Sequence, residues 1–284
     1  MKAIPSFLGL SLAAAVIALL PGSASAFPPA PHHVISGMIR DQYGNPVTDS
    51  SALVILQTPG GVRLANGIQP GLAPGVNYHL EVPMDAGNTV DLYEANALKT
   101  AASFKMYVVL GGITNTPIQM LNGYSQLGKP GGQTRMDLFL GSDSNGDGLP
   151  DEWQYAILAA LGLGPDLSQI NPNGRAYPGG MSYYGSFIAG TYPFDPSDAL
   201  MMRFVAVKGD SPIIEFNAIN GRTYTVLGSS DMKQWTPVSF QLPADGVSPA
   251  TRANIYVSGV QTIQVQALQP TTGPKLRFFK LLVQ

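Results

Sequence analysis

A twelve-residue stretch divides the chain near its middle: Asp143-Ser144-Asn145-Gly146-Asp147-Gly148-Leu149-Pro150-Asp151-Glu152-Trp153-Gln154. Oxygen-bearing side chains stand at its first, third, fifth and ninth positions, and a glycine stands at the sixth, where the chain must turn sharply. Ca²⁺ is a hard cation that prefers oxygen ligands, and this spacing is that of a calcium loop. The stretch therefore predicts one bound Ca²⁺. The predicted ligands are Asp143, Asn145, Asp147, Leu149 through its backbone carbonyl, Asp151 and Gln154.

The last ligand position departs from the calcium-loop pattern. Gln154 stands where such a loop carries a bidentate carboxylate, and Glu152 comes two residues too early. A neutral amide offers one contact in place of two charged ones, which predicts weak affinity, about 10⁻⁴–10⁻³ M as in extracellular modules. The alternative interpretation is a polar linker, because Asp, Asn, Ser and Gly also dominate turns. A linker explains neither the two-residue spacing of the oxygens nor a helix that starts at once.

The end of the loop and the residues that follow it predict two short helices. Pro150 suits a first helical turn. Trp153, Ile157 and Leu161 recur at four-residue spacing, so they should share one buried face. The glycine that follows predicts the end of this helix. A second helix is expected over residues 181–189.

The first 26 residues have the three parts of a secretory signal peptide. A basic residue, Lys2, precedes an apolar run from Phe7 to Leu20, and small residues follow at 24–26. The alternative is a membrane anchor, but the run is shorter than the about 20 residues that cross a bilayer. We expect cleavage before Phe27 and export to the periplasm, the cell surface or the medium. We expect no membrane span in the mature chain.

Composition favours an exported β protein and excludes several functions. Cysteine is absent, which leaves neither disulfides nor zinc-thiolate chemistry. Charged residues make up 12% of the chain and the formal net charge is −2, so nothing predicts nucleic-acid binding. The 32 glycines and 24 prolines indicate short strands joined by tight turns. The length of 284 residues fits one or two domains. The oligomeric state stays open.

The region before the calcium loop has the pattern of a β domain. An extended, proline-rich lead-in occupies 27–33; its His32 and His33 could bind a metal, but a solvated tail is favoured. Residues 34–141 then alternate between apolar and polar side chains, most clearly at 104–110 and 134–140. The region predicts an antiparallel sandwich.

The region after the loop repeats the β pattern. Over residues 201–284, Asn220-Gly221 is a hairpin signal. Residues 276–283 are apolar on both faces and predict a central, buried strand. The chain is therefore expected to be mainly β, with two antiparallel β-sandwich domains joined by a short helical calcium-loop segment at 142–200.

Three segments resemble parts of secreted bacterial proteins. Residues 35–47 are similar to the opening of carboxypeptidase-regulatory-like immunoglobulin-type domains. The calcium loop through Trp153 resembles the DxDGDGLPDxWE segment of thrombospondin type-3-like and dockerin-like repeats. Residues 221–238 and 277–281 resemble the terminal sandwich pattern GxxYxVxxSxDLxxWTxV…FYRL. These resemblances imply an architecture and an extracellular address, and they say little about activity.

The resemblance to calcium repeats also implies a second, altered loop. Residues 187–200 resemble the closing stretch YLAGTDPxDPxSAL of such repeats, which follows their second calcium loop. That loop should lie at 171–175, where Arg175 replaces an acid. A cation at a metal position opposes metal binding, so the second loop is expected to hold no ion. Asp195 and Asp198 are weaker candidates to reach the first site.

The leading functional hypothesis is non-catalytic. We expect an exported calcium-binding structural or surface protein whose ion rigidifies the hinge between the β domains. The alternative is a module that binds polysaccharide or a cohesin-like surface protein, because tyrosines gather beside the loop. Tyr177, Tyr183 and Tyr184 would then contact the ligand, whereas the competing interpretation packs them against the linker helices.

A hydrolase is the third hypothesis. Asp85, Asp91 and Glu94 could form a composite acid site, and His79 is the histidine on which a serine triad would depend. No motif in the chain has the spacing of a nucleophile with its base. Scattered surface carboxylates and a surface histidine are therefore the favoured interpretation.

Overall fold

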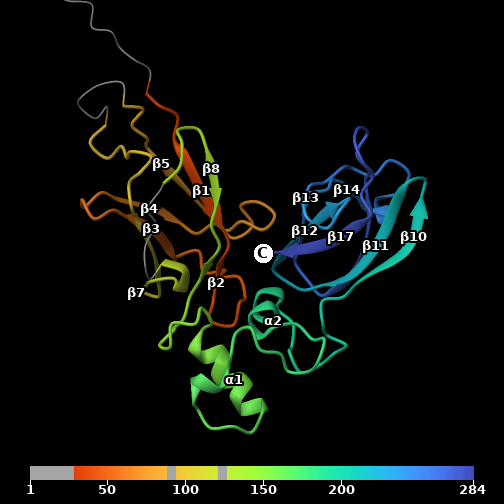
Figure 1. Ribbon diagram of the computed structural model, residues 1–284. Helices are drawn as coiled ribbons and strands as arrows, with labels where there is room; N and C mark the ends of the chain where they lie inside the picture. Colours follow the sequence, from red (N-terminus) through yellow and green to blue (C-terminus); the bar gives the residue numbers. More distant parts are fainter. Residues whose placement is uncertain (1–28, 88–93, 121–126) are drawn as a thin grey trace, which may run out of the picture.

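The computed structural model describes residues 29–87, 94–120 and 127–284. Within these ranges the chain is mainly β, with several antiparallel sheets and two α-helices, which confirms the predicted class. The β-rich N-terminal and C-terminal parts lie side by side, and the helices lie below them (Figure 1). The expected signal peptide at 1–26 lies outside the described residues.

The N-terminal part is built from short strands. They form one sheet of order β4-β3-β6-β7, a second of order β5-β1-β8, and the pair β2-β9. The bounds are β1 (His33–Gly37), β2 (Ile39–Arg40), β3 (Leu53–Gln57), β4 (Arg63–Gly67), β5 (Tyr78–Val82), β6 (Lys105–Leu110), β7 (Ile113–Asn115), β8 (Gln133–Arg135) and β9 (Leu138–Phe139), with a 3₁₀ turn, η1, at Ile118–Met120.

Two pairings in this part are parallel, which the expectation of antiparallel sheets did not include. β8 runs beside β1 in the same direction, with Val34 opposite Gln133, and β9 does the same beside β2. Parallel neighbours need a long crossover, and here most of the N-terminal part separates β1 from β8. The arrangement brings Arg135 and Asp137 to the side that faces α2 and β17.

Alternating side chains of β1, β3, β5 and β6 form the core of the N-terminal part. Leu56 and Met106 are fully buried there, and each such side chain contributes about 1.5–3 kcal/mol to folding. A buried amide, Asn77, ties the neighbouring loops together: its Oδ1 accepts from the backbone N–H of Ile39 at 2.7 Å, and its Nδ2 donates to the carbonyl of Val47 at 2.9 Å. Burial without such partners would be costly.

The helical segment has its own small core. α1 (Asp151–Ala160) starts at the ninth position of the predicted calcium loop, and α2 (Tyr183–Ala189) ends at a glycine in the left-handed conformation. Phe187 of α2 packs on Phe139 with ring centroids 5.2 Å apart and on Trp153 at 5.5 Å. The core therefore joins α1 and α2 to the last strand of the N-terminal part.

One residue of the predicted buried helix face lies elsewhere. Ile157 is buried and Trp153 packs against the same cluster, as expected. Leu161 is 42% exposed, so its placement on that face was wrong. The helix ends at Ala160, and Leu161 belongs to the turn that follows. A 3₁₀ turn, η2 (Leu167–Gln169), continues the chain towards α2.

The C-terminal part contains two sheets that share one core. The first has the order β10-β11-β16-β14; in the second, β12 pairs with β13, β15 and β17. Phe216 from the first and Tyr224 from the second meet with ring centroids 5.0 Å apart. The bounds are β10 (Met202–Lys208), β11 (Ser211–Ala218), β12 (Arg222–Ser229), β13 (Thr236–Pro237), β14 (Phe240–Gln241), β15 (Ile255–Val257), β16 (Gln261–Ala267) and β17 (Phe278–Val283), with a 3₁₀ turn, η3, at Pro243–Asp245.

Two strand predictions in this part were wrong. Asn220-Gly221 does not close a hairpin, because β11 and β12 belong to different sheets. Gly221 still adopts a positive φ of 74°, so the turn is tight but carries the chain from one sheet to the other. β17 is not central: among the described strands it pairs with β12 alone, and its Leu282 is exposed.

A buried arginine at the start of β12 joins all three parts. The Nε of Arg222 donates to the carbonyl of Ile188 at 2.6 Å, and its Nη2 donates to the carbonyl of Phe187 at 3.3 Å. Its Nη1 donates to the carbonyl of Gly44 at 2.6 Å. One rigid guanidinium fork thus holds α2 and an N-terminal loop against the C-terminal part.

Replacing Arg222 with methionine should loosen this junction. Three carbonyls lose a buried, charged donor, so we expect the free energy of unfolding to fall by at least about 1–3 kcal/mol. Urea unfolding measures the loss. Arg203→Met is the matched control, because Arg203 is exposed and its ion pair with Glu215 should contribute only about 0–1 kcal/mol. Equal small losses in both variants would contradict the role of Arg222.

The same substitution at Arg40 should have the opposite outcome. Arg40 is fully buried, its Nη1 makes one long bond of 3.4 Å to the carbonyl of Gly44, and its Nε and Nη2 have no partner. Burial, with the nearby charge of Arg222, lowers the pKa of Arg40 to about 9. Because a buried, poorly paired charge is costly, Arg40→Met should leave stability in urea unchanged or raise it. A loss as large as that of Arg222→Met would refute this assignment.

Candidate metal centre

The predicted calcium loop is closed by hydrogen bonds from its own backbone. The two carboxylate oxygens of Asp143 accept from the N–H groups of Asp147 and Gly148, both at 3.0 Å. Both oxygens of Asp151 accept from the N–H of Ser144, at 3.0 and 3.2 Å. The first and ninth positions therefore fix the fold of the loop. Leu149 anchors it, because its side chain is fully buried in the helical core.

Asp147 lies at the centre of the remaining contacts. Its Oδ1 accepts from the N–H of Leu149 at 2.9 Å and from Nε2 of Gln154 at 3.1 Å. Its Oδ2 accepts from Nδ2 of Asn145 at 2.9 Å. The side chains of the third, fifth and twelfth positions are thus in direct contact.

Gln154 carries the most informative geometry of the loop. The residue is 0% exposed. Its Nε2 also donates to the carbonyl of Leu149 at 3.2 Å, while its Oε1 is buried without a hydrogen-bond partner. A half-turn of the amide would place Oε1 beside Asp147 Oδ1 and the Leu149 carbonyl. Three oxygens that face one another repel unless a cation lies among them, so these residues fit a cation with hard oxygen ligands.

The carboxylates do not gather at one point. Across the described ranges, no group of three or more His, Cys, Asp or Glu side chains lies close enough to hold a metal ion. The structure brings Asn145, Asp147, the carbonyl of Leu149 and Gln154 together, and it uses Asp143 and Asp151 for backbone contacts. Calcium binding stays a prediction.

Glu152 has an unexpected position. Its Oε2 is buried and has no hydrogen-bond partner, beside Gly141 just before the loop. The sequence pattern gave it no role, because it falls between two ligand positions. An orphaned carboxylate oxygen next to a predicted cation loop makes it a further residue to test.

Hydrogen bonds hold the turns of the altered second loop. Oδ1 of Asn171 accepts from the N–H of Asn173 at 3.0 Å, and the guanidinium of Arg175 donates to the carbonyl of Gly180. Asp195 accepts from Ser197, and Asp198 accepts from the N–H of Tyr192 at 2.5 Å. Both aspartates take part in their own turn, and a role for either at the first site stays a prediction.

The three candidate tyrosines have different surroundings. Tyr183 is 8% exposed and packs edge-on against Phe194, and burial raises the pKa of its hydroxyl. Tyr177 is half-buried, with its ring against Gly180. Tyr184 is 44% exposed and lines a cleft with Arg135. Packing therefore describes Tyr183 and Tyr177, and Tyr184 is free to contact a ligand.

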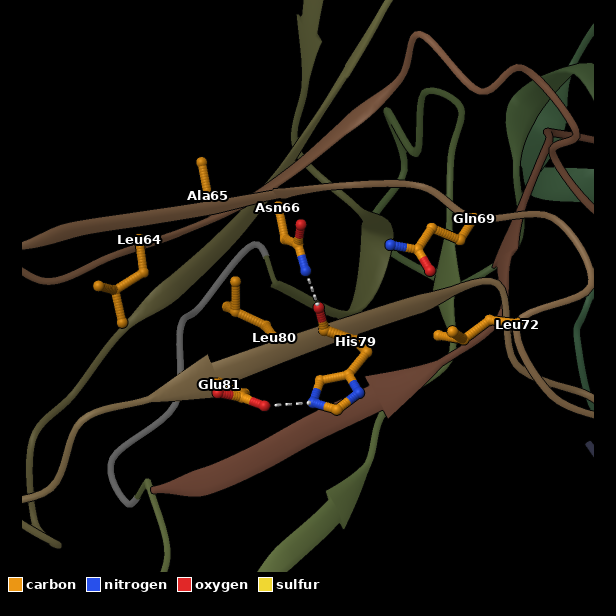
Figure 2. Close-up of a pocket in the computed structure, with 8 residues that line it drawn as sticks. All are labelled: Leu64, Ala65, Asn66, Gln69, Leu72, His79, Leu80 and Glu81. Carbon is orange, nitrogen blue, oxygen red and sulfur yellow. Dashed lines mark hydrogen bonds and ion pairs between the residues drawn. The ribbon is translucent and has the colours of Figure 1, made fainter. Parts of the chain in front are cut away.

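His79 and Asp85 of the hydrolase hypothesis do not line one pocket. His79 and Glu81 line a pocket of about 320 Å³ (Figure 2), and His79 Nε2 lies 3.6 Å from a Glu81 oxygen. His32 contacts the other oxygen of Glu81 at 3.2 Å. Asp85 accepts from a backbone N–H in its own turn and does not line this pocket. Asp91 lies outside the described residues.

No family model, curated protein or solved structure matches the chain. Within the described ranges, no helix is both long and apolar enough to cross a membrane. The resemblances of the calcium loop and of the two β regions stay predictions from the quoted residues.

The buried amide allows a test in which one substitution has opposite effects. Gln154→Glu would bury a second carboxylate against Asp147, so without calcium we expect the free energy of unfolding to fall by at least about 1–3 kcal/mol. With calcium, the added charged ligand should raise affinity by about tenfold or more. Thermal unfolding in chelator and in calcium measures both effects.

Gln261→Glu is the matched control for this experiment. Gln261 is exposed on β16, so the same change of charge should have the same small effect with and without calcium. If the calcium-dependent rise in melting temperature is no larger in Gln154→Glu than in the parent chain, then Gln154 is not a ligand.

Proposed function

We propose that the protein is an exported, non-catalytic calcium-binding structural or surface protein, in which the ion rigidifies the segment between two β-sandwich domains. The observation that carries the proposal is the buried amide of Gln154. This residue lies on the first turn of α1, and its amide faces Asp147 and the carbonyl of Leu149, which precede the helix. The Nε2 of this amide donates to both acceptors, while its Oε1 is buried without a partner. Turned by half a rotation, the amide would place Oε1 beside the two acceptors as a third oxygen ligand, which supports a cation site there.

The sandwich architecture is supported by how the cores are shared. In the C-terminal part, Phe216 and Tyr224 come from different sheets and meet in one cluster. In the N-terminal part, Val54 and Leu80 come from different sheets and belong to one cluster. Side chains from two sheets that fill one core are what a sandwich requires.

The route from the loop to the domain junction is short. Leu149, inside the loop, is buried in the same cluster as Phe139 and Phe187. The carbonyl of Phe187 accepts from Arg222, so the loop, α2 and the C-terminal part are linked by consecutive contacts. Ordering the loop would therefore also order the segment that sets the angle between the domains.

An exported address supports the choice of calcium. A weak loop would fill where calcium is plentiful, which suits the about 10⁻⁴–10⁻³ M affinities of extracellular modules. The signal-peptide pattern at 1–26 is the sequence feature behind this address. A surface polysaccharide or surface protein is the kind of partner that such a protein would meet.

Calcium should stabilise the full chain against heat and denaturant. If Kd is about 10⁻⁴ M, calcium at roughly 100 times Kd adds about 2.7 kcal/mol, because the ion binds the folded state alone. Calorimetry with calcium and with chelator measures the change, and isothermal titration measures the stoichiometry, for which we expect one ion per chain.

Asp147→Asn tests the site itself, because it removes charge from the central ligand while keeping an acceptor for the N–H of Leu149. The calcium-dependent gain should largely disappear. Asp166→Asn is the control: Asp166 is exposed and accepts from Ser168 in a similar local turn outside the loop. An unchanged melting profile with calcium, or an equal loss in both variants, would sink the proposal.

A further inference from the structure

A cleft lies where the three parts of the molecule meet. Its volume is about 310 Å³, within the range of small-molecule sites. Arg135 and Asp137 come from the N-terminal part, Tyr184 and Ile188 from α2, and Val283 from β17. Residues far apart in sequence thus converge on one small space.

The polar side of this cleft is held rigidly. Nη2 of Arg135 donates to Asp137 Oδ2 and to the carbonyl of Gly75, both at 3.1 Å. Oδ1 of Asp137 accepts from the N–H of Met38 at 2.9 Å. Each charged side chain is therefore fixed by the backbone as well as by the other, and its orientation does not have to be selected by a ligand.

The same pair still has capacity for a ligand. The side chain of Arg135 is 27% exposed and that of Asp137 is 13% exposed, so part of each reaches the surface, whereas Nε of Arg135 is buried. A carboxylate offers about four acceptor directions, and two of those of Asp137 are used by Met38 and Arg135. The cleft thus presents the accessible part of a charged donor beside a carboxylate with acceptor directions left, and their opposite charges cancel.

The other side of the cleft is aromatic and apolar. Tyr184 is 44% exposed although it lies on a helix whose neighbouring tyrosine is buried. The helix is held in place by the Ser182 cap and by the bond from the N–H of Tyr184 to the carbonyl of Pro172 at 3.0 Å. A fixed, exposed ring next to Ile188 gives a flat surface for stacking.

We propose that this cleft binds a neutral carbohydrate. A pyranose has adjacent hydroxyls, which both donate and accept, and a face of C–H groups. The hydroxyls suit the Arg135–Asp137 pair, and the face suits Tyr184. Because Arg135 and Asp137 already neutralise each other, the cleft does not select a charged ligand, and its volume of about 310 Å³ suits a small molecule.

The test titrates the full mature chain with soluble neutral oligosaccharides of glucose, mannose, galactose and xylose, followed by calorimetry and by NMR of the tyrosine rings. At least one should bind. Tyr184→Ala should weaken its binding by about tenfold or more, as expected for an aromatic anchor. Asp137→Asn, which keeps an acceptor for Met38, should also weaken it by about tenfold.

Tyr155→Ala is the matched control, because Tyr155 is a similarly exposed tyrosine, at 42%, on α1 and outside the cleft. It should bind as the parent chain does. Unfolding curves of all variants establish that they are folded, and calcium is present throughout. Absence of binding by every neutral sugar, equal loss in Tyr155→Ala, or binding of acidic oligosaccharides alone would overturn the proposal.

Discussion

The guanidinium of Arg222 is the contact on which the arrangement of the molecule depends. It donates to backbone carbonyls of α2 and of the loop after β2, so it fixes the backbone of these two segments and does not depend on their side chains. Burial lowers the pKa of Arg222, yet the group stays charged at neutral pH because the ordinary value is so high. A flat fork with fixed N–H directions can satisfy several carbonyls in set directions, whereas the ammonium of a lysine is a point charge on a flexible stem. The relative placement of the β parts, and hence the cleft between them, follows from this one side chain.

The predicted calcium loop and the cleft act on the same helix from different sides. Phe187 of α2 packs on Trp153, the eleventh residue of the loop, and one turn earlier Tyr184 lines the cleft. An ion that orders the loop would restrict α2, and a sugar on Tyr184 would do the same. By linkage, each ligand would then raise the affinity for the other by the same factor. If both proposals hold, the protein would bind a glycan with higher affinity at high calcium concentration, although the ion does not contact the sugar.

Local sequence patterns predicted the strands and helix ends well. They did not predict contacts between residues that are far apart in the sequence. β6 (Lys105–Leu110) lies where the alternation over residues 104–110 predicted a strand, and Gly190 ends α2 as glycines do. The Asn220-Gly221 turn was recognised, but whether a turn joins strands of one sheet or two depends on where β16 and β17 pair, which the turn does not encode. Tyr183 and Tyr184 are chemically equal, and only the helix face decides that one packs and the other is exposed. Arg222 gave no signal, because its partners are carbonyls far away in sequence.

Arg40 shows that this junction is not built for stability alone. Its guanidinium shares the carbonyl of Gly44 with Arg222, so two positive charges approach each other in a dry place. The guanidinium of Arg40 also lies close to Gly221 of the C-terminal part. A Cβ atom added to that glycine would be 3.5 Å from Nη1 of Arg40. Docking the two β parts therefore desolvates a charge that has few partners, which opposes docking. The helical segment must offset this desolvation cost. It does so through the packing of the Phe187 cluster and through the carbonyls of α2 that accept from Arg222. A cation bound in the adjoining loop would stabilise the helical segment. Because this segment offsets the cost of burying Arg40, the docking of the two β parts depends more strongly on the order of the loop.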